Sequence, residues 1–497
     1  MFRRLVPALV LALGPSAALA DAPTYPLSTP PPATTDPQSA EWGRREVIRV
    51  DPKPGEDPAE HALVSPIIYL NRCVGGCMVM PGNDDDATTA NPTSAIVALP
   101  SLLSEFQFSD TVWNDFVQCM KEVYSPFNVT VTETRPGAGT QYHHAIVAGT
   151  AQEAGLDAGV LGIAIVRGDC APRNNAVSLS LANSHTNNAT TAVTLCWTAA
   201  QESAHAFGLD HAFSFVDGQS ACNDPMTYRM DCGGQKFFRN NTANCGTNKV
   251  APCNCGSSQN SHAKILATFG PNEGAQLVGP PSSTVTSPTS GSLGAAVMAS
   301  AGSKRGVSKV ELILNGFKWA EAKGAAFGAN GQPNPSMYTL MVPGTVPNSI
   351  IDVVARACDD LGRCTDSAPV TVTKGGPCAD ASTCAKGQKC EAGKCFWDPP
   401  VGEVGDPCTY NEFCTSLICA GNEGSQICSQ NCVPGASDSC PMDMECVATG
   451  ATSGFCYPKE DGGGCCSVGN DDGPSGWFVH GGFSLLMLGL LLRRRRK

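Results

Sequence analysis

Hydrophobic positions follow two different periods along the first half of the chain, which predicts a domain that contains both helices and strands. In Asp110–Tyr124 the apolar side chains recur every three to four residues, as on one face of a helix. Residues 128–134 alternate valine with threonine and indicate a strand. Residues 191–207, ended by Gly208, and residues 257–269 are expected to be helices. Further strands are expected at residues 64–70, 142–147, 161–166 and 176–181.

A second pattern begins after a linker of Gly, Pro, Ser and Thr at residues 271–288. Short alternating runs at residues 308–314, 338–342, 350–357 and 368–372 predict strands without helices between them. The stretch 352–373, DVVARACDDLGRCTDSAPVTVT, resembles the closing hairpin of bacterial immunoglobulin-like modules. Asp359, Asp360 and Gly362 are its turn residues, and Cys358 and Cys364 are placed to bridge the turn. Residues 271–375 are therefore interpreted as a linker and an Ig-like β-sandwich.

Cysteine usage sets the compartment and the third module. The chain of 497 residues has 26 cysteines, which is typical of an oxidising environment. Residues 376–460 contain few apolar side chains, so disulfides have to stabilise this segment. Its pattern resembles small EGF-like or dickkopf-like knots, and its pairing cannot be derived from spacing. The cysteines of this module are 378, 384, 390, 395, 408, 414, 419, 428, 432, 440, 446 and 456.

Both ends of the chain have the composition of sorting signals. Arg3 and Arg4 precede the apolar run 5–13, and residues 18–20 form a small-x-small cleavage site, so residues 1–20 are expected to be a signal peptide. Residues 21–62 are rich in Pro, Thr and Ala without periodicity and are interpreted as a flexible leader. The body of the protein is thus expected outside the cytoplasm, at the cell surface, in the outer envelope or in the medium.

The C-terminal end combines glycine and cysteine at residues 462–466 with a linker (461–476) and a final segment (477–497). That segment is apolar up to residue 492 and then reads RRRRK. This order resembles the myxobacterial C-terminal sorting tail (MYXO-CTERM type), which implies processing near the Gly-Cys step and display on the cell surface. A plain C-terminal membrane anchor, a transmembrane helix with cytoplasmic cations, is the alternative. The resemblance implies a membrane contact before processing.

Residues 201–211, QESAHAFGLDH, carry the candidate chemistry of residues 63–270. Positions 201 and 205 share one face of a helix, so two side chains there can bind one metal ion. Glu202 lies beside them, where a general base would activate water. Gly208 permits a sharp turn that returns His211 toward the same point. This segment is similar to the zinc-protease signature H-E-x-x-H-x-x-G-x-x-H.

Residues 224–228, DPMTY, resemble the methionine turn of the metzincin clan of zinc metalloproteases. The resemblance covers residues 64–270 and implies an α+β metzincin-like catalytic domain with zinc as its cofactor. It implies that Met226 lies beneath the site and that Tyr228 contacts the metal or the oxyanion. Together with the signature it implies the ligands His205 and His211, which a residue at position 201 completes, and a peptide or protein substrate.

Gln201 departs from the signature, because a histidine ligand is expected there. An amide oxygen is a weaker zinc ligand than an imidazole, so the change is expected to weaken metal binding. Two functions stay open: a surface-attached zinc metallopeptidase weakened by Gln201, or an inactive pseudoprotease that acts in adhesion or interaction. The net charge of −12 argues against a nucleic-acid partner on either interpretation.

Overall fold

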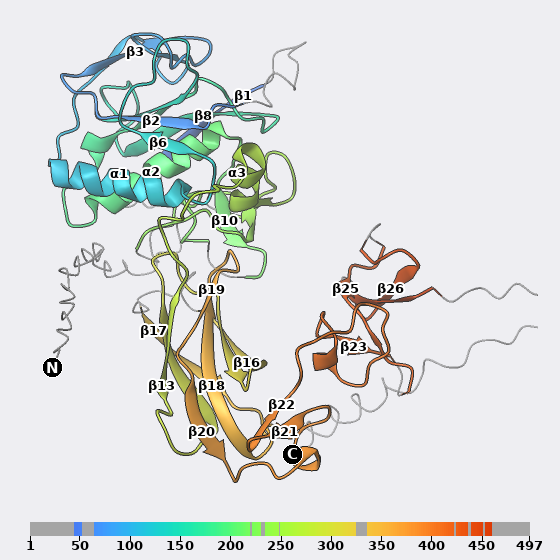
Figure 1. The fold of residues 1–497 in the computed structure, drawn as a ribbon. Helices are drawn as coiled ribbons and strands as arrows, with labels where there is room; N and C mark the ends of the chain where they lie inside the picture. Colours follow the sequence, from blue (N-terminus) through green and yellow to red (C-terminus); the bar gives the residue numbers. More distant parts are fainter. Residues whose placement is uncertain are drawn as a thin grey trace, which may run out of the picture. The chain divides into compact units, whose positions relative to one another are not determined.

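The structure is a computed structural model that describes residues 44–51, 64–218, 221–229, 234–247, 249–324, 335–421, 424–435, 439–450 and 453–459. These residues form β-sheets of two to six strands and three α-helices (Figure 1). The chain divides into two compact units, one ending at Trp397 and the other beginning at Asp398. The predicted signal peptide and the C-terminal segment 477–497 lie outside the described residues. Within the described residues, no helix has the length and apolarity needed to cross a membrane.

A six-stranded mixed sheet organises the N-terminal domain. Its strand order is β1-β8-β9-β7-β2-β6. β8 runs antiparallel to β9, whereas β7, β9, β2 and β6 are mutually parallel. The strands are β1 (Arg44–Val50), β2 (Ile67–Asn71), β6 (Thr130–Thr132), β7 (His143–Val147), β8 (Val160–Arg167) and β9 (Val177–Ser180).

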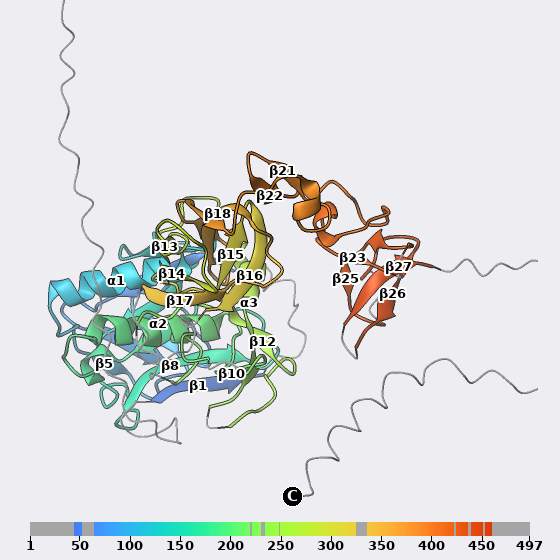
Figure 2. The same ribbon diagram turned by 90° about the horizontal axis from the view of Figure 1, so that it is seen from below.

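Two helices, α1 (Asp110–Tyr124) and α2 (Thr191–Ala206), lie side by side in both ribbon views (Figures 1 and 2). Phe116 of α1, Leu195 of α2 and Ile68 of the sheet belong to one buried apolar cluster, so both helices pack on the same core. A disulfide between Cys119 and Cys196 joins the helices. The side chain of Ser109 caps α1, because its oxygen accepts the amide N–H of Val112.

The sheet includes a strand that the sequence pattern does not predict. Residues 21–62 are expected to be a flexible leader, but Arg44–Val50 pairs in parallel with β8 over its whole length. The described part of the leader is therefore a structural element of the domain. The pattern misses it because RREVIRV has charged residues on both sides of its short apolar stretch.

Smaller elements complete the N-terminal domain. A helix, α3 (Ser261–Phe269), begins four residues later than predicted, and Asn260 caps it. One small sheet pairs β3 (Cys77–Pro81) with β4 (Thr93–Ser94) and β5 (Ser101–Leu103), and another joins β10 (Ala212–Phe215), β11 (Thr242–Cys245) and β12 (Gln259–Asn260).

The following module is a β-sandwich, as the sequence predicts. One sheet has the order β13-β14-β17, and the other pairs β16, β15 and β18, with β19 and β20 alongside β18. Val297, Leu340, Leu312 and Val353 belong to the buried core of the module, with two residues from each sheet. Cys358 and Cys364 form the predicted disulfide across the hairpin. The strands are β13 (Ser282–Ser287), β14 (Ala296–Gly302), β15 (Lys309–Leu314), β16 (Phe317–Lys323), β17 (Ser336–Met341), β18 (Ser349–Cys358), β19 (Cys364–Asp366) and β20 (Val370–Lys374).

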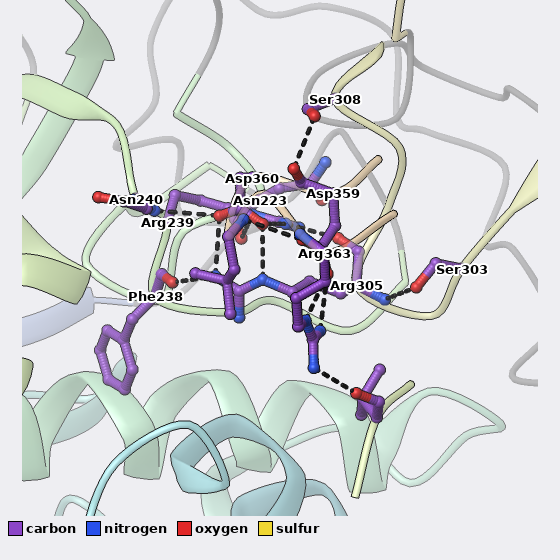
Figure 3. A network of polar contacts seen from close by, with 12 residues as sticks. Asn223, Phe238, Arg239, Asn240, Ser303, Arg305, Ser308, Asp359, Asp360 and Arg363 are labelled. Carbon is purple, nitrogen blue, oxygen red and sulfur yellow. Dashed lines mark hydrogen bonds and ion pairs between the residues drawn. The ribbon is translucent and has the colours of Figure 1, made fainter. Parts of the chain in front are cut away.

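A network of buried charges joins the sandwich to the N-terminal domain (Figure 3). Arg305 donates two hydrogen bonds to the carboxylate of Asp360, at 2.6 and 2.8 Å. Its guanidinium also donates to the carbonyl oxygen of Phe238 at 2.6 Å. Arg239 lies 3.6 Å from Asp360, and the amide of Asn240 donates to Asp360 at 3.0 Å. The contacts reach from one module to the other, so they hold the two together.

Disulfides organise the cysteine-rich segment, as predicted. The first unit contains β21 (Lys389–Glu391) and β22 (Lys394–Phe396), with disulfides 378–390 and 384–395. The second unit contains disulfides 408–419, 414–428, 432–446 and 440–456. Its strands are β23 (Cys419–Ala420), β24 (Ile427–Cys428), β25 (Asn431–Cys432), β26 (Met444–Ala448) and β27 (Gly454–Pro458). Three groups of sulfurs lie close enough to suggest a metal, but every sulfur in them is bonded to another.

Candidate metal centre

Gln201, Glu202 and His205 lie on the last two turns of α2, inside the protein. Gln201, Glu202 and His205 have no exposed surface. Gln201 and His205 are one helical turn apart and therefore share a face. Almost every residue of α2 is buried, so the helix runs through the core and not along the surface. A polar group on this helix has to find its partner inside the domain.

Gly208 ends the helix and turns the chain back. Its φ of +83° is a left-handed conformation that a side chain disfavours. A Cβ atom at this position would lie 2.1 Å from the carbonyl oxygen of Cys170, so the loop that contains Cys170 leaves no room for one. The turn returns the chain so that Nε2 of His211 lies 3.0 Å from Nε2 of His205. The structure thus brings these two predicted ligands together.

Both histidines are neutral in this environment. Burial lowers the pKa of His205 to about 4. Burial, and then the neighbouring His205, lower the pKa of His211 well below its usual range. Nδ1 of His205 lies 2.8 Å from the carbonyl oxygen of Leu209, which can only accept a hydrogen bond. The proton of His205 is therefore assigned to Nδ1, which leaves a lone pair on Nε2 facing His211.

Gln201 and Glu202 contribute buried oxygen atoms without partners. The side-chain nitrogen of Gln201 donates to the carbonyl oxygen of Met226 at 3.4 Å, whereas its Oε1 has no hydrogen-bond partner. Neither carboxylate oxygen of Glu202 has one. Burial raises the pKa of Glu202 well above its usual range, against the opposing charge of Arg45. Unpaired buried oxygens are costly, which is typical of a site that is completed by a ligand.

The turn at residues 224–228, which resembles a methionine turn, is held by the carboxyl group of Asp224, to which the sequence prediction gave no role. Oδ1 of Asp224 accepts the amide N–H of Met226 at 2.9 Å, and Oδ2 accepts that of Arg239 at 3.0 Å. The carbonyl oxygen of Met226 also accepts the amide of Ala212, at 2.8 Å. Met226, itself fully buried, therefore links the turn to the strand after His211 and to Gln201. The Asp-Pro pair, typical of turns, was the available signal for Asp224.

Tyr228 lies against His211, with 4.7 Å between the ring centroids. Its hydroxyl donates a hydrogen bond to the carbonyl oxygen of Arg45. Burial raises the pKa of Tyr228, so the hydroxyl keeps its proton. The guanidinium of Arg45 lies 5.1 Å from the centre of the Tyr228 ring and is 1% exposed. Arg45 is the main residue of the site that sequence reasoning misses, because it belongs to the segment interpreted as a leader.

Gly162 of β8 makes room for the candidate base. A Cβ atom at Gly162 would lie 2.5 Å from Oε1 of Glu202, so the carboxylate contacts the strand where a side chain is absent. Gly162 is also the residue that pairs with Arg45 in the register of β1 and β8. The carboxylate of Glu202, the backbone of β8 and Arg45 therefore meet at one point of the sheet.

The geometry fits a zinc ion between the two histidines. Two nitrogen ligands of a tetrahedral zinc are about 3.3 Å apart, since each Zn–N bond is about 2.0–2.1 Å. The 3.0 Å between the Nε2 atoms of His205 and His211 is close to this value. Leu209 orients His205 through Nδ1, as the outer partner of a zinc-bound histidine does. The unpaired Oε1 of Gln201 supplies a third candidate donor on the same helix.

Two other histidines are not where the sequence suggests. Because His143 and His144 are adjacent in a strand and face opposite ways, the sequence predicts that at most one of them points inward, but each is only 2% exposed. His143 lies 2.8 Å from the hydroxyl of Ser178, and the ring of His144 stacks on Tyr69. The strand they share is buried on both faces, because the sheet has packed layers on each side. Both rings are buried in the core of the domain.

Comparisons with known proteins leave the activity open. No family model matches the chain, and no curated protein matches it. Among solved structures, the chain is similar to the fibronectin(III)-like modules of Clostridium thermocellum CbhA, with 22% sequence identity and a TM-score of 0.13. The match covers 20% of this chain and 47% of that chain, so less than half of that chain's length is represented here. No functional conclusion rests on this partial likeness.

Proposed function

We propose that residues 63–270 form a metzincin-type, zinc-dependent metallopeptidase domain of an exported protein. The observation that carries the proposal is the pair of facing Nε2 atoms of His205 and His211, 3.0 Å apart, together with the buried oxygens of Gln201 and Glu202 that have no hydrogen-bond partner. The disulfides in every module favour an extracellular environment, which agrees with the predicted signal peptide and surface-sorting tail.

The residues have distinct roles in this proposal. His205, His211 and Oε1 of Gln201 would hold the zinc, which supplies Lewis-acid activation of water and of a peptide carbonyl. Glu202 takes a proton from the attacking water and passes it to the leaving amine. The protonated hydroxyl of Tyr228 donates a hydrogen bond to the substrate carbonyl as negative charge develops on it. Asp224 holds the loop of residues 224–228 through the amide of Met226, and the carbonyl oxygen of Met226 holds the side chain of Gln201.

A second function, an inactive pseudoprotease that acts in surface adhesion or interaction, is favoured by one observation. Gln201 occupies the position of a histidine ligand, and a neutral amide oxygen binds zinc less strongly than an imidazole. The sandwich and the cysteine-rich modules would then carry the interaction. The two functions differ in whether the natural chain holds zinc and cleaves peptide bonds.

Two measurements distinguish the metallopeptidase from the pseudoprotease: the zinc content of the purified protein and its cleavage of casein. Both are made on the wild type and on two variants. The metallopeptidase proposal predicts bound zinc, and cleavage that falls by about 10²–10⁴-fold in Glu202→Ala. Gln201→His restores the third imidazole and is expected to tighten zinc binding by at least about tenfold.

The outcomes separate the candidates. Zinc and cleavage that are present only in Gln201→His would identify the natural chain as a pseudoprotease. A wild type whose cleavage survives Glu202→Ala unchanged would rule out the assigned site.

A further inference from the structure

The closing hairpin of the sandwich contacts residues 238–240 of the N-terminal domain, which follow the turn at residues 224–228 in the chain. Asp360 lies between β18 and β19, and its carboxylate is 6% exposed. It accepts the amide N–H of Asn240 at 3.0 Å, and it lies 3.6 Å from the guanidinium of Arg239. Arg305, also of the sandwich, donates to the carbonyl oxygen of Phe238 at 2.6 Å. The sandwich therefore binds three successive residues of the N-terminal domain (Figure 3).

The middle one of these residues, Arg239, also binds the beginning of the turn. Its amide N–H donates to Oδ2 of Asp224 at 3.0 Å, and the hydroxyl of Ser261 donates to the same oxygen at 2.5 Å. Nε of Arg239 donates to the carbonyl oxygen of Asn223 at 3.3 Å, and the amide of Phe237 donates to that oxygen at 3.1 Å. Residues 223 and 224 are thus held by the same segment that the sandwich holds.

Asp224 in turn fixes the carbonyl oxygen of Met226. Its Oδ1 accepts the amide N–H of Met226 at 2.9 Å. The carbonyl oxygen of Met226 accepts the side-chain amide of Gln201 at 3.4 Å and the backbone amide of Ala212 at 2.8 Å. Ala212 directly follows His211. One carbonyl oxygen therefore positions the candidate oxygen ligand and the neighbour of a candidate histidine ligand.

The side chain of Gln201 depends on this contact. Among the residues that the structure describes, its bond to Met226 is the only hydrogen bond that it makes, since its Oε1 has none. A neutral amide oxygen is a weak zinc ligand. A weak ligand contributes most when it is already held in its binding position, because the conformational freedom that it would otherwise lose on binding reduces the affinity.

We infer that Asp360 of the sandwich is a positioning residue for the candidate ligand Gln201. It acts through the backbone of Arg239, the carboxyl group of Asp224 and the carbonyl oxygen of Met226. The sandwich is then a part of the candidate metal centre as well as an appended module. The inference rests on the proposed function for the role of zinc, whereas the chain of contacts exists without a metal.

The test compares Asp360→Asn with the matched control Val353→Ala in the full chain. Asp360→Asn keeps the size of the side chain but removes the charge that pairs with Arg305. Val353 is fully buried in the core of the same sandwich, so Val353→Ala destabilises the module by leaving a cavity and removes none of the contacts with the N-terminal domain. Zinc affinity is measured by competition with a chromophoric chelator. Hydrogen–deuterium exchange of residues 224–228 is measured in the metal-free proteins by mass spectrometry.

The inference predicts that Asp360→Asn binds zinc about tenfold more weakly than the wild type, which is the lower end of the loss on removing the outer partner of a metal ligand. Exchange of residues 224–228 is expected to be faster in this variant, because the segment that holds Asp224 has lost its support. Val353→Ala should match the wild type in both measurements. If near-ultraviolet circular dichroism finds Asp360→Asn unfolded, Arg239→Lys repeats the comparison, since it keeps the charge but loses the Nε donor to Asn223.

Two results overturn the inference where the wild type binds zinc. One is an Asp360→Asn protein in which either the zinc affinity or the exchange of residues 224–228 equals that of the wild type. The other is an equal change in Asp360→Asn and Val353→Ala, because a general loss of stability would explain it.

Failure of the proposed function gives a different result. A wild type without bound zinc, in which Asp360→Asn alone speeds the exchange of residues 224–228, refutes the peptidase and keeps the chain of contacts from Asp360 to the turn. A wild type that binds zinc, with an Asp360→Asn variant that matches it in affinity and exchange, keeps the metal site and refutes Asp360 as its positioning residue.

Discussion

At the candidate metal centre, the carboxylate of Glu202 is fully buried and neither oxygen has a hydrogen-bond partner. At the junction with the sandwich, the carboxylate of Asp360 is 6% exposed and accepts two hydrogen bonds from Arg305 and one from the amide of Asn240. Both regions place a carboxyl group away from water, which is costly unless the group is paired. At the candidate metal centre no hydrogen bond compensates for the lost hydration of Glu202, whereas at the junction the neighbouring arginines and an amide compensate for that of Asp360.

This difference separates a site from a structural joint. Burial alone would raise the pKa of Asp360, but Arg305 and Arg239 hold it at about 2. Burial raises the pKa of Glu202 well above its usual range, and the charge of Arg45 does not offset this effect. A carboxylate that the fold stabilises keeps modules together. One that the fold leaves destabilised is available to a metal, a proton or a substrate.

The largest expected effect on stability comes from breaking the joint. Asp360→Ala leaves Arg305 buried without its bidentate partner and is expected to lower the free energy of unfolding by about 3–5 kcal/mol. Urea unfolding followed by tryptophan fluorescence measures it. The control is Asp366→Ala, which removes an exposed ion pair, because the side chain of Arg356 is 41% exposed and that of Asp366 is 48% exposed. This change should lower the free energy of unfolding by about 0–1 kcal/mol. Equal losses in the two variants would mean that the buried network has no special role.

Acid should weaken the same joint by a smaller amount. The pKa of an aspartate in an unfolded chain is about 3.9, and the pKa of Asp360 in the folded protein is about 2. The ionised Asp360 therefore contributes its full stabilisation of the folded state above about pH 4. It is lost as the pH falls toward 2, and amounts to about 2–3 kcal/mol. Unfolding free energies across this pH window should fall more steeply for wild type than for Asp360→Asn. Parallel curves would contradict the assignment.

The smallest effect, and one of opposite sign, is expected at the candidate centre. Glu202→Gln replaces an unpaired buried carboxylate by a neutral amide of similar size, so the free energy of unfolding should rise by about 1 kcal/mol. The measurement is made with a chelator present, so that no metal contributes. A large loss of stability would show that Glu202 is a structural residue, and would remove the contrast with Asp360.

The helices and part of the strands could be predicted because they depend on local pattern, whereas β14 and β16 were not expected and β13 lies in the segment interpreted as a linker. The helix expected at residues 191–207 is α2 (Thr191–Ala206), and the hairpin bridged by Cys358 and Cys364 forms as expected. Spacing on a helix and a turn at Gly208 also sufficed to predict that His205 and His211 converge. These features depend on the chain within a few residues of each position.

Long-range contacts could not be predicted. The pairing of Arg44–Val50 with β8 joins residues more than one hundred positions apart, and its charged pattern gave no sign of a buried strand. The burial of His143 and His144 follows from layers that pack on both faces of the sheet. The joint between Arg305, Arg239 and Asp360 likewise depends on how two modules dock.

The amino-acid sequence by itself determined the module order, the disulfide-rich character and the residue types offered to a metal, because composition and short-range periodicity carry that information. The tertiary structure decided which buried groups are paired and which are not. It placed Arg45 against Tyr228, beside Glu202, and left Oε1 of Gln201 without a partner. The physical reason is that desolvation depends on everything that surrounds a group in space, and most of those neighbours come from distant parts of the chain.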